Sequence, residues 1–248
     1  MTKTNEKIVE ITGLYKKYGK NADYAIKDIN IECCAGEIVG LLGKNGAGKS
    51  TTIKCLTGYF PFDKGTIKIC GHDIRTEPVK AKMNLGYVPD DRAMFDRMTG
   101  SEYVDFVADV HATPVAERKK RIEEMQEIFR LGDKIDNLIS SYSHGMRQKI
   151  CIMASLVHHP KLWLLDEPLT GLDPQTAKAL RDYMKYYKEQ GNTVLYSSHN
   201  LDAVEKTCDK AYIINNGRLV ETIDIKEFAL NNPNTGLEEA FIRQFEDK

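Results

Sequence analysis

The sequence lacks any long uninterrupted run of apolar residues. No segment of the 248 residues reaches the roughly 18 consecutive apolar residues that a membrane-spanning helix requires. The opening residues, MTKTNEKIVE, have no apolar stretch behind their basic positions, so we expect no secretory signal. These absences argue against a chain that crosses a bilayer by itself, and they predict a cytosolic protein.

An excess of charge of one sign is also missing, because the formal net charge is −1. We therefore expect no global field that attracts nucleic acid, and no nucleic-acid partner. The densest basic run, residues 117–121, precedes apolar residues at helical spacing and is interpreted as the solvated face of an amphipathic helix. The six cysteines form no CxxC pair, which argues against a zinc site and a disulfide framework and predicts small apolar core residues.

Internal repeats, low-complexity tracts and Pro/Gly/Ser-rich linkers are absent as well. Length alone fits one large α/β domain or two small ones, but without a linker we predict one domain over residues 1–248. Its expected parts are a core with a β layer over residues 1–98 and 161–220, a helical subdomain over residues 99–160 and a short tail over residues 221–248.

Two kinds of strand are predicted. Residues 7–11 and 29–32 alternate between apolar and polar types, which favours an antiparallel layer with one wet face. Residues 37–42, 162–165 and 193–196 are short apolar runs, which favour buried parallel strands that end in polar residues at one edge of a sheet.

The pattern becomes mostly helical between Thr99 and Pro160. Within it we expect a helix from Val115 to Leu131 with Gly132 as its left-handed cap.

A phosphate-binding motif follows the first buried run. Residues 43–50 match GxxxxGK[ST], the Walker A pattern, between a predicted strand and a predicted helix. In such a loop backbone N–H groups point at phosphate oxygens, the lysine reaches the β- and γ-phosphates, and the hydroxyl ligates Mg²⁺. The predicted ATP contacts are Gly43, Asn45, Gly46, Ala47, Gly48, Lys49, Ser50 and Thr51, and Ser50 is a predicted Mg²⁺ ligand.

An acidic pair ends the buried run at residues 162–165. Asp166 is the predicted Walker B residue, which holds Mg²⁺ through water. Glu167 follows it, near the position from which water attacks the γ-phosphate, and is the predicted general base. By themselves these motifs are typical of kinases, GTPases, helicases and transporters alike.

Further motifs resemble those of ATP-binding cassette (ABC) ATPases over nearly the whole chain. Residues 140–149, SSYSHGMRQK, resemble the signature in its export-type form, YSxGMxQ. Tyr18 is similar to the family's A-loop aromatic, residues 170–173 to its D-loop and His199 to its switch histidine. The implied fold is α/β, a P-loop NTPase (RecA-like) core with an N-terminal antiparallel β subdomain and an inserted α-helical signature subdomain.

The resemblance also implies roles for these residues. Tyr18 would stack on adenine, a contact that would also admit GTP, and His199 would hold the attacking water as a second catalytic residue. Ser143 and the Gly145 N–H would contact ATP bound to a second ABC subunit, a homodimer or heterodimer partner, with Asp173 along the seam. ATP-driven closure of the dimer would then drive separate integral membrane subunits, with the chain peripheral on the cytoplasmic face.

Two positions leave questions open. Asp90 lies where this family usually has glutamine and this branch often has glutamate; we carry it over as a nucleotide contact and Mg²⁺ ligand. Residues 94–98 lie where the family receives a coupling helix from the membrane subunit, but they are also consistent with packing inside the helical subdomain.

The sequence favours export through the form of its signature, although separate cassettes also serve importers. A soluble ABC mechanoprotein acting on ribosomes or DNA is the alternative, but such families carry long coiled-coil insertions or two cassettes in one chain, and neither occurs here. A P-loop kinase of small molecules does not explain the signature, D-loop and histidine.

Overall fold

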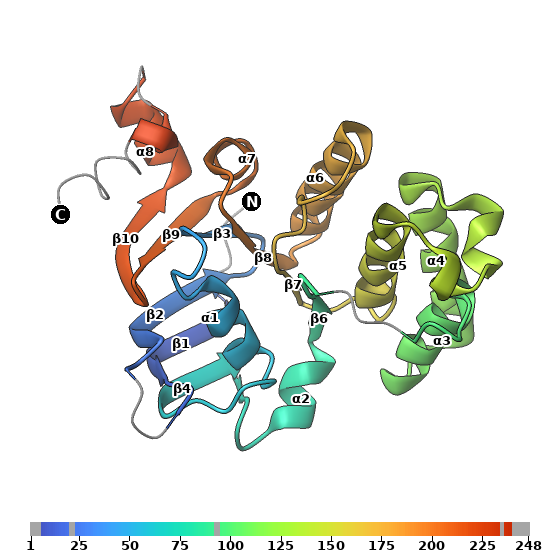
Figure 1. Ribbon diagram of the computed structural model, residues 1–248, viewed down its shortest axis with the longest axis horizontal. Coiled ribbons are helices and arrows are strands. Elements are labelled where there is room, and N and C mark those ends of the chain that lie inside the picture. The colour runs from blue at the N-terminus through green and yellow to red at the C-terminus, as the bar shows by residue number, and fades with distance from the viewer. Residues whose placement is uncertain (1–5, 20–22, 92–94, 234–235, 240–248) are drawn as a thin grey trace.

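The computed structural model describes residues 6–19, 23–91, 95–233 and 236–239 (Figure 1). The strands are β1 (Lys7–Lys16), β2 (Ile26–Cys34), β3 (Ile38–Leu42), β4 (Lys64–Ile69), β5 (His72–Asp73), β6 (Leu85–Val88), β7 (Leu162–Leu165), β8 (Thr193–Ser198), β9 (Lys210–Asn215) and β10 (Arg218–Asp224). The helices are α1 (Lys49–Leu56), α2 (Pro78–Met83), α3 (Gly100–Val110), α4 (Val115–Phe129), α5 (His144–Leu156), α6 (Pro174–Glu189), α7 (Leu201–Thr207) and α8 (Ile225–Asn231), with 3₁₀ turns η1 (Gly132–Asp136) and η2 (Ile139–Ser141). In these ranges no helix combines the length and hydropathy needed to cross a bilayer.

A six-stranded sheet carries the core in the order β10-β9-β3-β8-β7-β6. Its inner strands pair in parallel, and β10 joins β9 antiparallel. Strands β3, β7 and β8 are buried along their whole length, as their apolar runs predict for strands covered on both faces. Because these neighbours run the same way, their carboxyl ends meet at one edge of the sheet.

The two faces of this sheet belong to two apolar cores. Val39 and Leu41 of β3 point into a core shared with α1 and the second sheet, and Ile38 and Leu42 point into a core shared with α5 and α6. This alternation follows from the two-residue period of a strand. The second sheet, β2-β1-β4-β5, is antiparallel and confirms the predicted N-terminal β layer.

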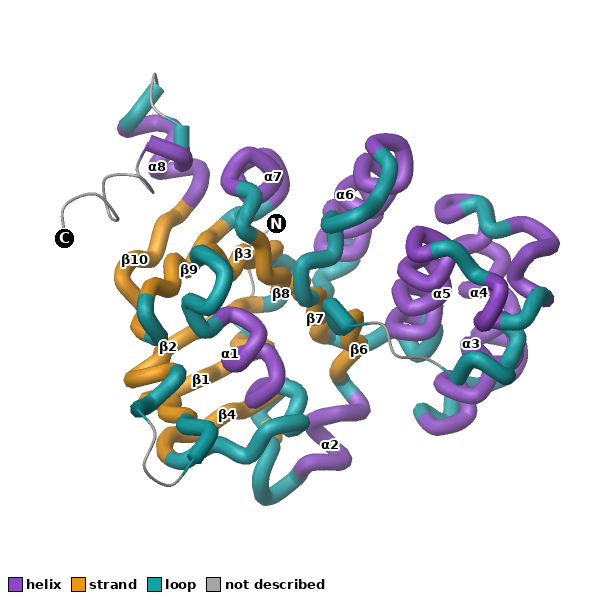
Figure 2. Tube along the Cα trace, in the orientation of Figure 1, coloured by secondary structure: helices purple, strands orange, loops and turns teal. Residues whose placement is uncertain are grey.

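Helices α3, α4 and α5 form a separate lobe beside the sheets, reached through the chain around β6 and β7 (Figures 1 and 2). A capping box starts α3, in which the Thr99 side chain accepts from the Glu102 N–H and the Glu102 carboxylate accepts from the Thr99 N–H. The helices pack around buried Val104, Met125 and Ile150. The helical insertion expected between residues 99 and 160 is therefore present.

Local details differ from the expectations in three places. Helix α4 ends at Phe129 and is capped by Arg130, which is left-handed at φ 52°; Gly132 is also left-handed, at φ 58°, but it begins the following 3₁₀ turn η1. The expected core–tail boundary at residue 220 falls inside β10, which pairs with β9 as far as Asp224. Only four of the six cysteines predicted to be core residues are buried, namely Cys33, Cys55, Cys151 and Cys208; Cys34 and Cys70 are partly exposed.

Candidate functional site

The loop between β3 and α1 is built for close approach to an anion. A Cβ at Gly43 would lie 2.4 Å from the carbonyl oxygen of Ile214, and Gly48 has φ 114°, so both positions require glycine. Gly48 is the N-cap of α1 and offers no side-chain hydrogen bond to the helix. The first N–H groups of α1 therefore remain available to phosphate oxygens, beside the positive end of the helix dipole.

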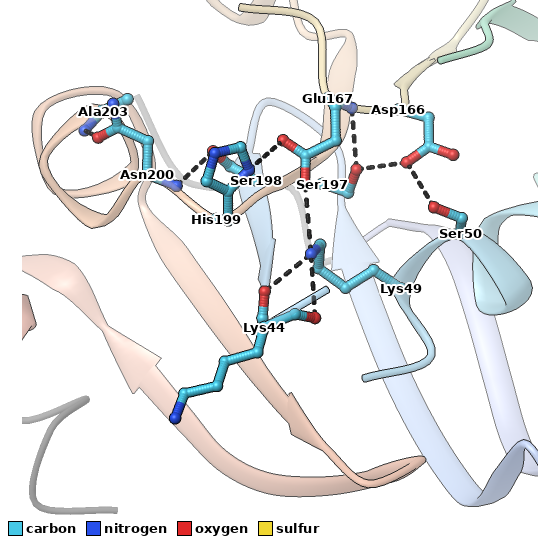
Figure 3. Close-up of polar contacts among 11 residues, drawn as sticks. Lys44, Lys49, Ser50, Asp166, Glu167, Ser197, Ser198, His199, Asn200 and Ala203 are labelled. Atoms are coloured by element: carbon cyan, nitrogen blue, oxygen red, sulfur yellow. Dashed lines mark hydrogen bonds and ion pairs between the residues drawn. The ribbon is translucent and has the colours of Figure 1, made fainter. Parts of the chain in front are cut away.

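The buried side chain of Lys49 contacts the backbone of this loop. Its side chain is 5% exposed, its Nζ donates to the Gly43 carbonyl oxygen at 2.7 Å, and the same Nζ lies 3.3 Å from Oε1 of Glu167. Lys49 opens α1, whereas Glu167 follows β7 (Figure 3). The two parts of the predicted site thus meet at the carboxyl edge of the sheet.

Asp166 is 1% exposed, and its two oxygens have different surroundings. Oδ1 accepts from Ser50 Oγ at 3.2 Å and from Ser197 Oγ at 2.5 Å. Oδ2 is buried and has no hydrogen-bond partner among the described residues. A buried carboxylate oxygen without a partner, beside a serine hydroxyl, is an oxygen donor set that fits Mg²⁺.

Burial raises the pKa of Asp166 above its ordinary value. The hydrogen bonds from Ser197 and Ser50 oppose this rise, and the negative charges of Asp90 and Glu167 add to it. Asp90 is exposed just beyond β6, the strand next to β7, and its charge acts on Asp166 from there. A cation at this point would relieve the accumulated negative charge.

Glu167 has a left-handed backbone conformation, with φ 48°. Such a conformation costs about 1–3 kcal/mol for a residue other than glycine and is typical of functional sites. Its N–H donates to Ser197 Oγ at 2.9 Å, and its Oε2 lies 3.0 Å from Nδ1 of His199. The carboxylate is therefore held between Lys49 and His199 (Figure 3).

Tyr18 lies beside the first turn of α1, the helix that follows the phosphate-binding loop. Its hydroxyl is 2.8 Å from Thr51 Oγ1 on α1, its ring packs edge-on against Phe60, and the residue is 58% exposed. A fixed aromatic ring with an open face can stack on a base.

The signature residues lie in the helical lobe, away from α1 (Figure 1). Ser143 is the N-cap of α5 and accepts from the Met146 N–H at 3.3 Å, and a Cβ at Gly145 would meet no atom of the described residues within 4 Å. Asp173 caps α6 through Thr176, whose N–H and hydroxyl lie 3.0 and 2.6 Å from the Asp173 oxygens. The structure thus brings the P-loop, Asp166, Glu167 and His199 together, but not Ser143 or Gly145.

The D-loop lies against the signature helix. Gln148 is buried and donates to the Pro168 carbonyl oxygen, and a Cβ at Gly171 would lie 3.1 Å from the His144 ring.

Residues 95–98 divide between the two interpretations of their segment, and Met94 lies outside the described residues. Met98 packs against the core of the helical lobe, whereas Phe95 is 57% exposed and contacts Phe106 edge-on.

Sequence reasoning missed Ser197, which contacts both acidic residues. The available signal was a serine that follows the apolar run of β8 at residues 194–196 and lies two residues before His199.

Comparisons with known proteins agree with this geometry. The family model described as ABC transporter matches residues 26–170. The chain is 37% identical over 213 residues to the linearmycin resistance ATP-binding protein LnrL of Bacillus subtilis, covering 86% of this chain and 68% of that protein. It is 34% identical over 212 residues to the daunorubicin/doxorubicin resistance ATP-binding protein DrrA of Streptomyces peucetius, covering 86% and 64%. A solved ATP-binding subunit of an ABC transporter matches with a TM-score of 0.89 at 29% identity, over 95% of this chain and 98% of that one.

Proposed function

The chain belongs to the ABC transporter family and is an ATPase, and from that premise we propose that it powers an exporter through ATP-driven closure of a cassette dimer. The observation that carries this proposal is the meeting of Lys49, Asp166, Glu167 and His199 at one sheet edge. Such a site supports phosphate binding and activation of water in one place.

The residues divide the work of hydrolysis. Lys49 and the N–H groups of α1 hold the phosphates, and Glu167 takes a proton from the attacking water as general base. Nδ1 of His199 faces the Glu167 carboxylate, which only accepts hydrogen bonds, so Nδ1 carries the proton. In the neutral imidazole Nε2 then accepts a hydrogen from the water, which orients its lone pair toward the γ-phosphate.

Ser50, Asp166 and Asp90 are the proposed Mg²⁺ residues. When bound at these residues, Mg²⁺ would supply positive charge that offsets the negative charge of the phosphates. Ser50 would supply its hydroxyl, Asp166 its unpaired Oδ2 through water, and Asp90 its exposed carboxylate.

Replacing Asp90 by Gln, the common residue at this position, tests whether the shorter acid limits the rate of ATP hydrolysis. An unchanged dependence of hydrolysis on Mg²⁺ concentration would remove Asp90 from the proposed Mg²⁺ residues.

The distant signature supports a dimer. Since Ser143 and Gly145 lie in the helical lobe, they would complete a nucleotide site on a second subunit, with Asp173 along the seam. ATP would then join two cassettes, and hydrolysis would separate them.

Size-exclusion chromatography of Glu167→Gln with Mg-ATP tests this closure. The variant keeps the binding groups but lacks the base, so a stable dimer is expected, with the ADP-bound wild type as a monomeric control. A variant that elutes as a monomer at high protein concentration contradicts the mechanism.

We further propose that separate integral membrane subunits are the partners, with this chain at the cytoplasmic face. An apolar cavity of about 480 Å³ between α2, β6, α3 and α5 is a suitable surface, because Val107 and Val110 line it and Val110 is 62% exposed. Phe95 and Phe106 are also exposed nearby on α3 and the segment before it.

The names of LnrL and DrrA include drug resistance, and together with the YSHGMRQ form of the signature they support export. Affinity capture of the tagged chain from gently solubilised membranes should recover a polytopic membrane protein. Val110→Glu should reduce that recovery while Val115→Glu, an equally exposed valine on α4, should not. Recovery of ribosomal or DNA-associated proteins alone would refute the proposal.

A further inference from the structure

Ser197 joins the two acidic residues of the site and is shielded from solvent. It lies in β8, is fully buried, and its Oγ is 2.5 Å from Asp166 Oδ1 and 2.9 Å from the N–H of Glu167. We propose that Ser197 is a positioning residue that sets the orientation of the Asp166 carboxylate and of the Glu167 backbone. This inference rests on the proposed ATPase site and assigns a further residue to it.

The direction of both hydrogen bonds follows from the chemistry of the groups. A backbone N–H can only donate, so Ser197 Oγ accepts from Glu167. An ionised carboxylate can only accept, so the single hydroxyl proton of Ser197 goes to Asp166. The only proton of the hydroxyl is therefore donated to Asp166 while its oxygen accepts from Glu167, which gives the hydroxyl one orientation.

The hydrogen bond from Ser197 to Asp166 selects which oxygen of Asp166 faces the metal position. Ser197 and Ser50 both bind Oδ1, and Oδ2 remains buried without a partner from the described part of the chain. Loss of the Ser197 hydroxyl would remove the shorter of these bonds and let the carboxylate rotate. Second-sphere partners of this kind typically change metal affinity or activity by about 10- to 100-fold.

The hydrogen bond from the Glu167 N–H to Ser197 Oγ anchors the Glu167 backbone, which is held in an unfavourable conformation. Glu167 has φ 48°, and its carboxylate must span Lys49 on one side and His199 on the other. His199 follows Ser197 by two residues along the chain, so the end of β8 supports Glu167 through both its backbone and its side chain. Without the anchor, Glu167 can leave the left-handed region and move its carboxylate away from the attacking water.

Four variants of the full-length chain separate this role from mere burial of a hydroxyl. Ser197→Ala removes the hydroxyl group. Ser197→Thr keeps the hydroxyl and adds a methyl group to Cβ, whereas Ser197→Val has the same branched shape with a methyl group in place of the hydroxyl. Ser155→Ala is the matched control, because Ser155 is also buried and its Oγ also has two partners, Ile152 O at 2.8 Å and Trp163 Nε1 at 3.0 Å, neither of which belongs to Asp166 or Glu167.

Two readouts are used. Hydrogen exchange at the Glu167 amide in nucleotide-free protein reports the backbone anchor without metal or activity. The Mg²⁺ concentration for half-maximal ATP hydrolysis reports the orientation of Asp166. We expect Ala and Val to accelerate the exchange and to raise that concentration about 10- to 100-fold. Thr should stay within about threefold of wild type, and so should Ser155→Ala.

ATP binding in EDTA should change little in all four variants, which verifies that the phosphate loop is folded. Equal behaviour of Thr and Val in both readouts would overturn the inference, and so would the same shifts in Ser155→Ala. A wild-type chain without ATPase activity would instead contradict the ATPase site on which the proposed function rests, and the amide-exchange result would still decide the role of Ser197.

Discussion

Replacement of Glu167 by Gln should tighten ATP binding while it abolishes most of the turnover. Glu167 Oε1 lies 3.3 Å from Lys49 Nζ, so the carboxylate competes with phosphate for the same ammonium group. Glutamine keeps an oxygen that can accept from Lys49 but has no negative charge. The competition weakens, and repulsion between the side chain and the γ-phosphate disappears.

The magnitude follows from the kind of contact that is lost. Lys49 pairs with a carboxylate in wild type and would pair with a neutral amide in the variant; hydrogen bonds that involve a charged group contribute about 1.5–3 kcal/mol, so a change from the ion-pair end of that range to the neutral-acceptor end releases about 1.5 kcal/mol. Solvent screening is small, because the side chains of Lys49 and Glu167 are only 5% and 14% exposed. Since 1.4 kcal/mol is tenfold in affinity, ATP should bind about tenfold more tightly. Hydrolysis should fall by about 10²- to 10⁴-fold with loss of the base.

Titration calorimetry with Mg-ATP and a phosphate-release assay measure the two effects on one preparation. Glu37→Gln is the matched control, because Glu37 is also a buried carboxylate near a lysine. Glu37 directly precedes β3, and its Oε2 lies 3.5 Å from Nζ of Lys210 on β9. Its affinity for ATP should equal that of wild type. Weaker or unchanged ATP binding in Glu167→Gln would refute the competition between carboxylate and phosphate, and unchanged turnover would refute the assignment of the base.

Three further outcomes are expected. Lys49→Ala removes a phosphate contact and should weaken ATP binding by about 10- to 100-fold in calorimetry, and an equal dissociation constant would contradict its role. Gly43→Ala would place a Cβ 2.4 Å from the Ile214 carbonyl oxygen and should lower the free energy of unfolding by about 1–3 kcal/mol. Gly145→Ala would place its Cβ more than 4 Å from every atom of the described residues outside its own helix turn, and should leave Tm unchanged. Burial lowers the pKa of His158 to about 4, so its contribution to stability is present above about pH 6.5 and is lost as the pH falls toward 4. Between pH 7.5 and 5 wild type should lose about 2 kcal/mol more than His158→Phe in urea unfolding, and parallel pH profiles would refute this.

Short-range features of the fold were predictable because their causes are local. The strand β7 has the predicted bounds, since an apolar run flanked by polar residues specifies both ends. The hairpin of β9 and β10 was missed, although Asn216-Gly217 is a strong turn signal and both residues have positive φ. The cap of α4 was misplaced because Arg130 takes a conformation that glycine usually provides.

The candidate site divides in the same way. The sequence by itself determined the phosphate loop, because its glycines, Lys49 and Ser50 are consecutive and act through their own backbone. It also indicated Asp166, Glu167 and His199, but only as isolated motifs at the ends of separate strands.

Only the tertiary structure decided how these motifs meet. Ser50 and Asp166 are 116 residues apart in the chain, and their contact depends on the strand order β3-β8-β7, which no local pattern specifies. That order also brings Ser197 of β8 between Asp166 and Glu167 after β7. The physical reason is that a hydrogen bond is directional and short, so the role of a side chain such as Ser197 exists only once neighbouring strands fix its two partners.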